Sequence, residues 1–228
     1  MSGKVLLISG GTSGVGLAVA LQALNSDYQV FVTGTKQEKL DQVLDRIASE
    51  RLAGCIADTT EWPALEAAVK KARDRFGRID AIIASAGRSA HGDFESGDPA
   101  EWQQMVLTNV LGPALLVRAS LPSLQESQGH IMLVGSVLGR RPTAGSLYAA
   151  TKSAVAAMSE SLRQQLCETQ IRVCAIHPGR IDTPWWPSGA APPALDADSV
   201  ASAVHWVLSQ PRDVDINEIV LRPLGQKN

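Results

Sequence analysis

Residues 4–24, KVLLISGGTSGVGLAVALQAL, run from an apolar segment through a glycine-rich turn into a helical pattern. The segment at 4–9 is typical of a buried strand, and the residues from about Leu17 to Leu24 are typical of a helix. Glycines permit a tight turn, and a helix N-terminus presents free N–H groups and a partial positive charge to an anion. Such a turn alone is often simple chain punctuation, but its place between a strand and a helix predicts a pyrophosphate site. The spacing is GxxxGxG, which differs from the GxGxxG of the commonest dinucleotide fingerprint.

Six further apolar or β-branched runs follow along the chain, with helical patterns between them. They lie at residues 29–34, 52–57, 79–85, 130–136, 171–177 and 217–223. The pattern at 61–76 repeats apolar residues at the spacing of a single buried helix face. Alternation of this kind predicts a parallel sheet with helices on both faces. We therefore expect one α/β domain over residues 1–228, a Rossmann-type doubly wound sheet that binds ligands beyond the carboxyl ends of its strands.

The composition is that of an ordinary globular protein, with 45% hydrophobic and 19% charged residues among 228. A net charge of −2 gives no broad basic field, so we expect no nucleic-acid partner and no binding to anionic membranes. The N-terminal apolar run is too short for a secretion signal or a membrane span. Three cysteines without CxxC spacing and four scattered histidines indicate neither disulfides nor a metal site, and a reducing cytoplasm fits best.

The end of the second expected strand, Gly34-Thr35-Lys36, bears on the choice of a nicotinamide cofactor. A site that prefers NAD usually places an acidic residue there to hold the ribose hydroxyls, and this sequence has none at that point. The Thr35 hydroxyl and the Lys36 ammonium can instead bind a 2′-phosphate, which favours NADP(H), with NAD(H) as the alternative. The plainer interpretation is that Lys36 is a solvated residue at the start of the next helix.

Tyr148 and Lys152 lie four residues apart in an alanine-rich stretch that predicts a helix, so they share one helix face. A phenol has an ordinary pKa of about 10 and is a poor acid or base at neutral pH unless a nearby cation favours its anion. Lys152 is expected to lower the pKa of Tyr148 in this way. The pair alone is weak evidence, because a core tyrosine followed by a surface lysine is common.

Two polar residues precede this pair in the sequence. Ser136 ends the expected strand at 130–136, where its hydroxyl can polarise a substrate carbonyl beside Tyr148 or can simply start a turn. Asn109 falls inside a long helical pattern, where an amide is mildly unfavourable. It therefore either faces solvent or belongs to a buried polar network.

A turn and a loop follow the sixth expected strand. The turn, residues 178–183 (PGRIDT), can line a cofactor pocket or can be an ordinary exit turn. The segment 183–196 is rich in proline and glycine and predicts a loop or lid at the substrate site. Trp185 and Trp186 can close over an apolar substrate, or can pack under the loop or in a subunit contact.

Taken together, these motifs resemble those of the short-chain dehydrogenase/reductase (SDR) family over nearly the whole chain. Residues 9–16 are similar to its TGxxxGxG motif, with Ser9 in place of threonine, and residues 178–183 are similar to its PGxxxT motif. Residues 84–87 (ASAG) stand where the family has NNAG, so both asparagines are absent. The residues that fall in the family's catalytic order are Asn109, Ser136, Tyr148 and Lys152.

The resemblance implies an oxidoreductase that interconverts a carbonyl and a secondary alcohol by hydride transfer with a nicotinamide cofactor. Tyr148 would transfer the proton and Lys152 would hold the nicotinamide ribose. Ser136 would fix the carbonyl oxygen, and Asn109 would order a water that connects Lys152 to solvent. The residues expected to contact the cofactor are Gly10, Thr12, Ser13, Gly14, Val15, Gly16, Thr35, Lys36, Asp58, Ala86, Gly87, Tyr148, Lys152, Pro178, Gly179, Ile181 and Thr183. No metal is expected.

The sequence indicates the substrate class and the oligomeric state less directly than the cofactor. The tryptophan pair favours a small to medium, partly apolar substrate, and an anionic substrate near Arg140 or Arg180 is the alternative. Members of the family are often tetramers, so a homotetramer or homodimer is expected.

Two other functions are compatible with the same fold. One is a catalytically silent dinucleotide-sensing regulator, because a fold does not prove activity. The other is an epimerase or dehydratase, which would need a larger substrate region than the short C-terminal part supplies.

Overall fold

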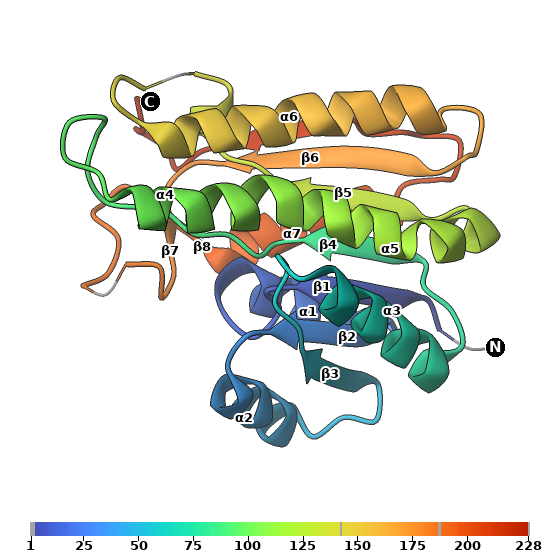
Figure 1. Ribbon diagram of the computed structural model, residues 1–228. Coiled ribbons are helices and arrows are strands. Elements are labelled where there is room, and N and C mark those ends of the chain that lie inside the picture. Colours follow the sequence, from blue (N-terminus) through green and yellow to red (C-terminus); the bar gives the residue numbers. More distant parts are fainter. Residues whose placement is uncertain (1–2, 142, 187, 228) are drawn as a thin grey trace.

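The computed structural model describes residues 3–141, 143–186 and 188–227. In this part of the chain seven parallel strands form one sheet in the order β3-β2-β1-β4-β5-β6-β9 (Figure 1). The strands are β1 (Val5–Ser9), β2 (Gln29–Gly34), β3 (Leu52–Ile56), β4 (Ala81–Ala84), β5 (His130–Val134), β6 (Arg172–Pro178) and β9 (Glu218–Leu221). The seven predicted runs are therefore strands, with ends shifted by at most two residues, and the doubly wound parallel sheet is confirmed.

Helices cover both faces of the sheet (Figure 1). They are α1 (Gly14–Asn25), α2 (Gln37–Ile47), α3 (Trp62–Phe76), α4 (Pro99–Val106), α5 (Gly112–Ser127), α6 (Leu147–Leu166) and α7 (Ala197–Ser209). A short π-helix, η1 (Leu107–Leu111), joins α4 to α5, and a 3₁₀ turn, η2 (Val137–Gly139), follows β5. The helix predicted at 61–76 begins at Trp62 and buries the expected face, with Leu65 and Ala72 fully covered.

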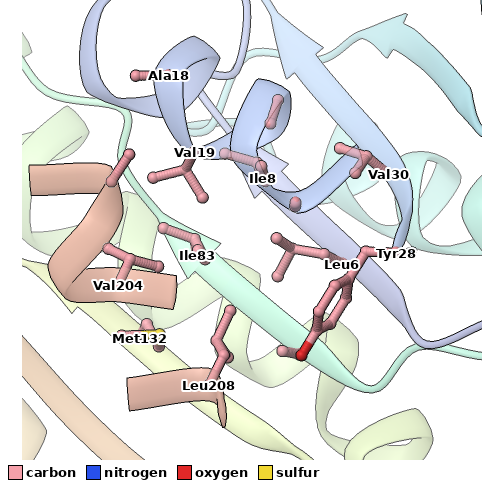
Figure 2. Packing of buried hydrophobic residues seen from close by; sticks show 14 of the residues in the cluster. Leu6, Ile8, Ala18, Val19, Tyr28, Val30, Ile83, Met132, Val204 and Leu208 are labelled. Atoms are coloured by element: carbon pink, nitrogen blue, oxygen red, sulfur yellow. The ribbon is translucent and has the colours of Figure 1, made fainter. Parts of the chain in front are cut away.

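Strand β1 lies at the centre of the sheet, and all five of its residues are buried. Successive strand side chains point to opposite faces, so β1 contributes to two separate cores. Leu6 and Ile8 pack in one core with α1 and α7, as Figure 2 shows, whereas Val5 and Leu7 pack in the other with α3, α5 and α6. The apolar run at the start of the sequence thus holds the two helical layers to the sheet.

The sheet reverses its order between β1 and β4. On one side of β1 the chain runs outward through β2 to β3, and it then crosses back to β4 on the other side. The chain consequently leaves β1 and β4 toward opposite sides of the sheet, and a crevice forms at the carboxyl edge, which is where ligands bind in sheets of this type. The backbones of these turns nearly touch: a Cβ on Gly10, whose φ is +68°, would lie 2.8 Å from the Ala86 nitrogen.

The sequence patterns did not predict a short parallel ladder between β7 (Ile181–Asp182) and β8 (Leu195–Asp196). It closes the base of the predicted loop at 183–196, and the Leu195 N–H donates to the Arg180 carbonyl at 2.8 Å. Both strands are two residues long, too short for the alternation that reveals a strand. Residue 187 of this loop lies outside the described residues.

The continuous helical stretch Pro99–Ser127 is long and apolar enough, by length and composition alone, to cross a membrane. Its apolar side chains Leu116, Val117 and Leu124 are instead buried in the core that α5 shares with α3 and the sheet. Figure 1 shows this stretch lying along the sheet as one of its covering helices. A core helix of this kind satisfies the same length and composition test, so the stretch is weak evidence for a membrane span.

The central position of β1 makes Leu6 a sensitive probe of folding. Leu6→Ala removes a fully buried side chain at the junction of β1, α1 and α7, and leaves a cavity. We expect the free energy of unfolding to fall by about 3 kcal/mol, since buried Leu→Ala changes cost roughly 2–5 kcal/mol. Urea unfolding measures the change. Leu224→Ala is the matched control, because Leu224 is 99% exposed and its loss should change stability by less than about 0.5 kcal/mol.

Candidate active site

The glycine turn and the N-terminus of α1 form one wall of the crevice. Ser13 is the N-cap of α1 but makes no side-chain capping bond, and the first turn has no acidic residue. Free N–H groups therefore remain at this helix end and favour an anion. A Cβ at Gly16 would overlap the Gly10 carbonyl, so the helix and the turn approach as closely as they do because both residues are glycine.

Ser9 links this turn to the turn after β4. Its hydroxyl accepts a hydrogen bond from the Ala86 N–H at 3.4 Å. The turn at residues 84–87 lacks the two asparagines of the resembling motif, and this contact supplies part of the support that their side chains would give. The serine that replaces threonine at position 9 is therefore part of the site's scaffold.

A cavity of about 620 Å³ lies in the crevice. It extends from the glycine turn past the ends of β2 and β3 to the turn after β4 and the start of the loop at 183–196. The predicted cofactor residues that line it are Gly10, Thr12, Ser13, Gly14, Thr35, Lys36, Asp58, Ala86, Gly87 and Thr183. The predicted residues that do not line it are Val15, Gly16, Tyr148, Lys152, Pro178, Gly179 and Ile181. The turn at 178–183 thus reaches the cavity through its last residue.

Two cations on the cavity wall were missed by the sequence analysis. Lys39 lies in the first turn of α2, close along the chain to Lys36, the N-cap of that helix. A cation in a first turn opposes the helix dipole, and this unfavourable placement was a usable signal for an anion site. Arg88 follows the turn after β4 and carried no such signal, because a single arginine in a loop has no pattern.

Asn109 belongs to a buried polar network and does not face solvent. It lies in the π-helix η1 with 1% of its surface exposed. Its Oδ1 accepts from the Arg88 N–H at 2.9 Å, and its Nδ2 donates to the Arg88 carbonyl at 2.8 Å and to Thr151 Oγ1 at 3.0 Å. Thr151 Oγ1 donates in turn to the Tyr148 carbonyl at 2.8 Å. The amide therefore ties the turn after β4 to α6, the helix that carries Tyr148 and Lys152.

Lys152 is buried against the end of β5. It is 5% exposed, its Nζ donates to the Val134 carbonyl at 2.9 Å, and burial lowers its pKa to about 8. The Nζ lies 5.8 Å from the centre of the Tyr148 ring. The predicted i,i+4 pair on one helix face is therefore present, with the amine directed to a backbone carbonyl.

Burial raises the pKa of Tyr148 to about 12, and a hydrogen bond with Ser136 acts in the opposite direction. This shift is opposite to the one expected from the charge of Lys152. A nearby ammonium lowers the pKa of a phenol, but the desolvation of this partly buried phenol raises it and dominates here. The Trp185 ring contacts the Tyr148 ring edge-on with centroids 6.0 Å apart, and this contact contributes to the burial.

Ser136 lies beside Tyr148, two residues beyond the end of β5, as the N-cap of η2. Its Oγ accepts from the Leu138 N–H at 3.2 Å, and the residue is 8% exposed. The serine thus begins a turn and also lies beside the phenol, so the turn interpretation is confirmed and its role toward a substrate carbonyl stays a prediction. Asn109, Ser136, Tyr148 and Lys152, which come from three segments of the chain, converge around α6.

The two arginines considered for an anionic substrate have other partners. Arg140 Nε forms an ion pair with Glu218 Oε1 at 2.8 Å, and Arg180 donates to the Ala191 carbonyl at 2.9 Å. Neither lines the cavity, whereas Arg88 does. Among the described residues no cluster of three His, Cys, Asp or Glu side chains is placed to hold a metal.

A glycine turn at the switch point of a parallel sheet, beside a Tyr-Lys pair, defines a Rossmann-type dinucleotide-binding α/β protein. The family model of short chain dehydrogenases matches residues 4–191. The chain belongs to the short-chain dehydrogenase/reductase family of oxidoreductases, as its motifs predicted.

Individual relatives agree with this assignment. An uncharacterized oxidoreductase of Staphylococcus saprophyticus is 34% identical over 230 residues, which covers 97% of each chain. The structure of an alcohol dehydrogenase from the archaeon Thermococcus sibiricus, complexed with 5-hydroxy-NADP, is 26% identical with a TM-score of 0.91, covering 99% of this chain and 98% of that one. A closed form of serine dehydrogenase complexed with NADP⁺ is 28% identical with a TM-score of 0.90, covering 98% and 96%.

The buried amine gives a prediction about stability. The pKa of Lys152 is about 8 in the folded protein, below its ordinary value of 10.5, so folding disfavours the charged form. The penalty is complete below pH 8 and disappears as the pH rises to the ordinary value. Lys152→Met should raise the free energy of unfolding at pH 7 by about 1–2 kcal/mol, because the lost bond to Val134 offsets part of the gain. Urea unfolding from pH 6 to 10 should show this advantage shrinking as the pH rises.

Lys71→Met is the matched control, because Lys71 is exposed on α3 and is changed in the same way. Its effect on stability should not follow the titration of a buried amine. An advantage of Lys152→Met that stayed constant across this pH range would contradict the assignment of the penalty to the buried charge.

Proposed function

We propose that the protein is an NADP(H)-dependent oxidoreductase that interconverts a carbonyl and a secondary alcohol, with Tyr148 as the general acid and base. The observation that carries the proposal is the convergence of Asn109, Ser136, Tyr148 and Lys152 around α6, next to a cavity that begins at the glycine turn. A regulator without catalysis would need the cavity alone and would leave this polar arrangement without a use.

The residues of the cavity fit NADP(H). The free N–H groups at the start of α1 suit a pyrophosphate, and Thr35, Lys36 and Lys39 suit a 2′-phosphate. Two solved structures of similar fold hold NADP⁺ or a derivative of NADP, which supports the same choice. When bound, the nicotinamide would supply or accept the hydride.

The chain's own residues would carry the proton chemistry. Because the pKa of Tyr148 is about 12, the phenol is protonated at neutral pH and can donate to an alkoxide that develops during carbonyl reduction. Ser136, whose side chain lies beside the phenol and acts on its pKa, would fix the carbonyl oxygen beside it. Lys152, whose pKa burial lowers to about 8, can return a proton to the phenolate. Asn109 would hold the helix that presents both groups.

The walls near Tyr148 favour a small to medium substrate with an apolar part. Trp185 packs edge-on against Tyr148 and lines the cavity with Pro184. Gln104, Thr108 and Arg88 supply polar groups on the same cavity. We propose that the loop at 183–196, which carries the tryptophan, acts as a lid that excludes water from the reacting groups.

Cofactor preference tests the anion site. We expect saturable binding of NADPH that is tighter than binding of NADH, followed by quenching of tryptophan fluorescence. In Lys36→Ala/Lys39→Ala the affinity for NADPH should fall about 10²- to 10⁴-fold, because two charged hydrogen bonds contribute roughly 1.5–3 kcal/mol each, while affinity for NADH should change little. The control Lys70→Ala removes an exposed lysine of α3 that does not line the cavity. Equal losses for both cofactors would contradict a 2′-phosphate site.

The catalytic assignment is tested by Tyr148→Phe, which removes the phenolic proton and keeps the ring that packs on Trp185. With NADPH and a panel of ketones and aldehydes, kcat should fall about 10²- to 10⁴-fold, the range of general acid–base catalysis. The affinity for NADPH should stay within about threefold of the parent. Substantial turnover by a folded variant would exclude Tyr148 as the acid. Tight NADPH binding by the parent with no turnover across the panel would favour the dinucleotide-sensing alternative.

A further inference from the structure

A buried histidine lies directly behind the active-site serine. His177, near the end of β6, is 1% exposed, and its Nδ1 lies 3.2 Å from the Ser136 carbonyl oxygen. Its ring packs so closely on Gly135, the residue before the serine, that a Cβ there would overlap the ring. Neither the sequence motifs nor the proposed chemistry assigns a role to this imidazole.

The opposite ring nitrogen leads to the surface. His177 Nε2 lies 3.3 Å from Glu218 Oε1, and Arg140 Nε lies 2.8 Å from the same oxygen. Arg140 comes directly after η2, the turn that Ser136 begins. The turn is therefore connected to β6 at its start, through the histidine, and to β9 at its end, through the ion pair of Arg140 with Glu218. Glu218 Oε1 lies close to both residues.

We infer that His177 is a positioning residue for Ser136, which it holds through the serine's main-chain carbonyl, with Glu218 and Arg140 completing the clasp. The inference rests on the proposed function in so far as Ser136 is a catalytic residue there. The other bonds of the serine within its own segment are local, since its carbonyl also accepts from the Gly139 N–H at 2.9 Å and its Oγ accepts from the Leu138 N–H, while its side chain also acts on Tyr148. His177 thus supplies the long-range bond that sets the serine relative to the sheet.

Hydrogen-bond chemistry determines where the proton of the ring lies. A carbonyl oxygen only accepts, so a bond to Ser136 requires the hydrogen on Nδ1. Burial lowers the pKa of His177; Glu218 and the bond to Ser136 oppose the shift, while Arg140 and Lys152 reinforce it. The neutral ring therefore has one N–H, directed to the serine. Its Nε2 then has no hydrogen to donate, so Glu218 Oε1 lies beside it without a hydrogen bond and is bound by Arg140.

Two substitutions of His177, each of which places an amide where one of the two ring nitrogens lies, separate the contact with Ser136 from the contact with Glu218. In His177→Asn the amide nitrogen can occupy the place of Nδ1 and donate to Ser136, but nothing reaches Glu218. In His177→Gln the amide reaches the place of Nε2, and no donor remains beside Ser136. His130→Asn is the matched control, since His130 is 2% exposed and lies at the opposite, amino end of its strand. Glu218→Ala, at a partly exposed edge position, weakens the clasp without touching the core.

The readout uses the tyrosine that Ser136 contacts and requires no substrate. The chain has two tyrosines, so incorporation of 3-fluorotyrosine gives two fluorine resonances, and Tyr28→Phe assigns that of Tyr148. Ser136→Ala defines the shift that results when the serine hydroxyl is lost. We expect His177→Gln to move the Tyr148 resonance in the same direction, Glu218→Ala to move it less, and His177→Asn and His130→Asn to leave it in place.

Equal shifts of the Tyr148 resonance in His177→Asn and His177→Gln would overturn the inference. It would also be overturned if His177→Gln caused no shift, or if Glu218→Ala caused none. With a substrate, His177→Gln should lower kcat about 10- to 100-fold, since small misplacements of reacting groups have effects of this size, while the KM for NADPH stays unchanged. His177→Asn should restore most of this kcat. Failure of NADPH binding or turnover in the parent would overturn the proposed function and would leave the fluorine result valid.

Discussion

The close approach of two backbone turns determines where everything else in this site lies. Gly10 follows β1 and Ala86 follows β4, and no side chain fits between them. Because β1 and β4 are hydrogen-bonded neighbours at the point where the sheet order reverses, this contact fixes both walls of the crevice. The N–H groups of α1 then face one side of the cavity, and the turn that Asn109 binds faces the other. A larger residue at position 10 would separate these walls and with them the anion site and the polar site.

Much of the fold could be predicted from the sequence because its strands are buried on both sides and therefore appear as continuous apolar runs. Elements that lack such a run could not be found in this way. The β7–β8 ladder is two residues long on each side, and the π-helix at Asn109 has the same composition as an ordinary helix. Lys39 was overlooked because it looks like a solvated surface residue. Only its position in the first turn of α2, known once the helix start is known, makes it unusual.

The site residues were predicted by order and spacing, but their ionisation depends on burial, which a linear sequence does not contain. Desolvation separates the pKa values of Tyr148 and Lys152, to about 12 and about 8, although the ordinary values are 10.0 and 10.5. One cause therefore produces opposite shifts in an acid and a base. Each shift disfavours the charged form, so both groups are held closer to neutrality than they would be in water.

The two side chains that orient the site, those of Asn109 and His177, bind main-chain atoms of the neighbouring turns. The positions of the turns therefore do not depend on the side chains that would contact a substrate. Asn109 holds both the N–H and the carbonyl of Arg88, so the position of that turn does not depend on which side chain residue 88 carries. The guanidinium at this position lines the cavity. In the same way His177 reaches the carbonyl of Ser136 and leaves its hydroxyl for the phenol. An SDR site built like this can change the side chains that meet a substrate while the proton-transferring groups keep their places, because the bonds that orient the helix and the two turns would remain.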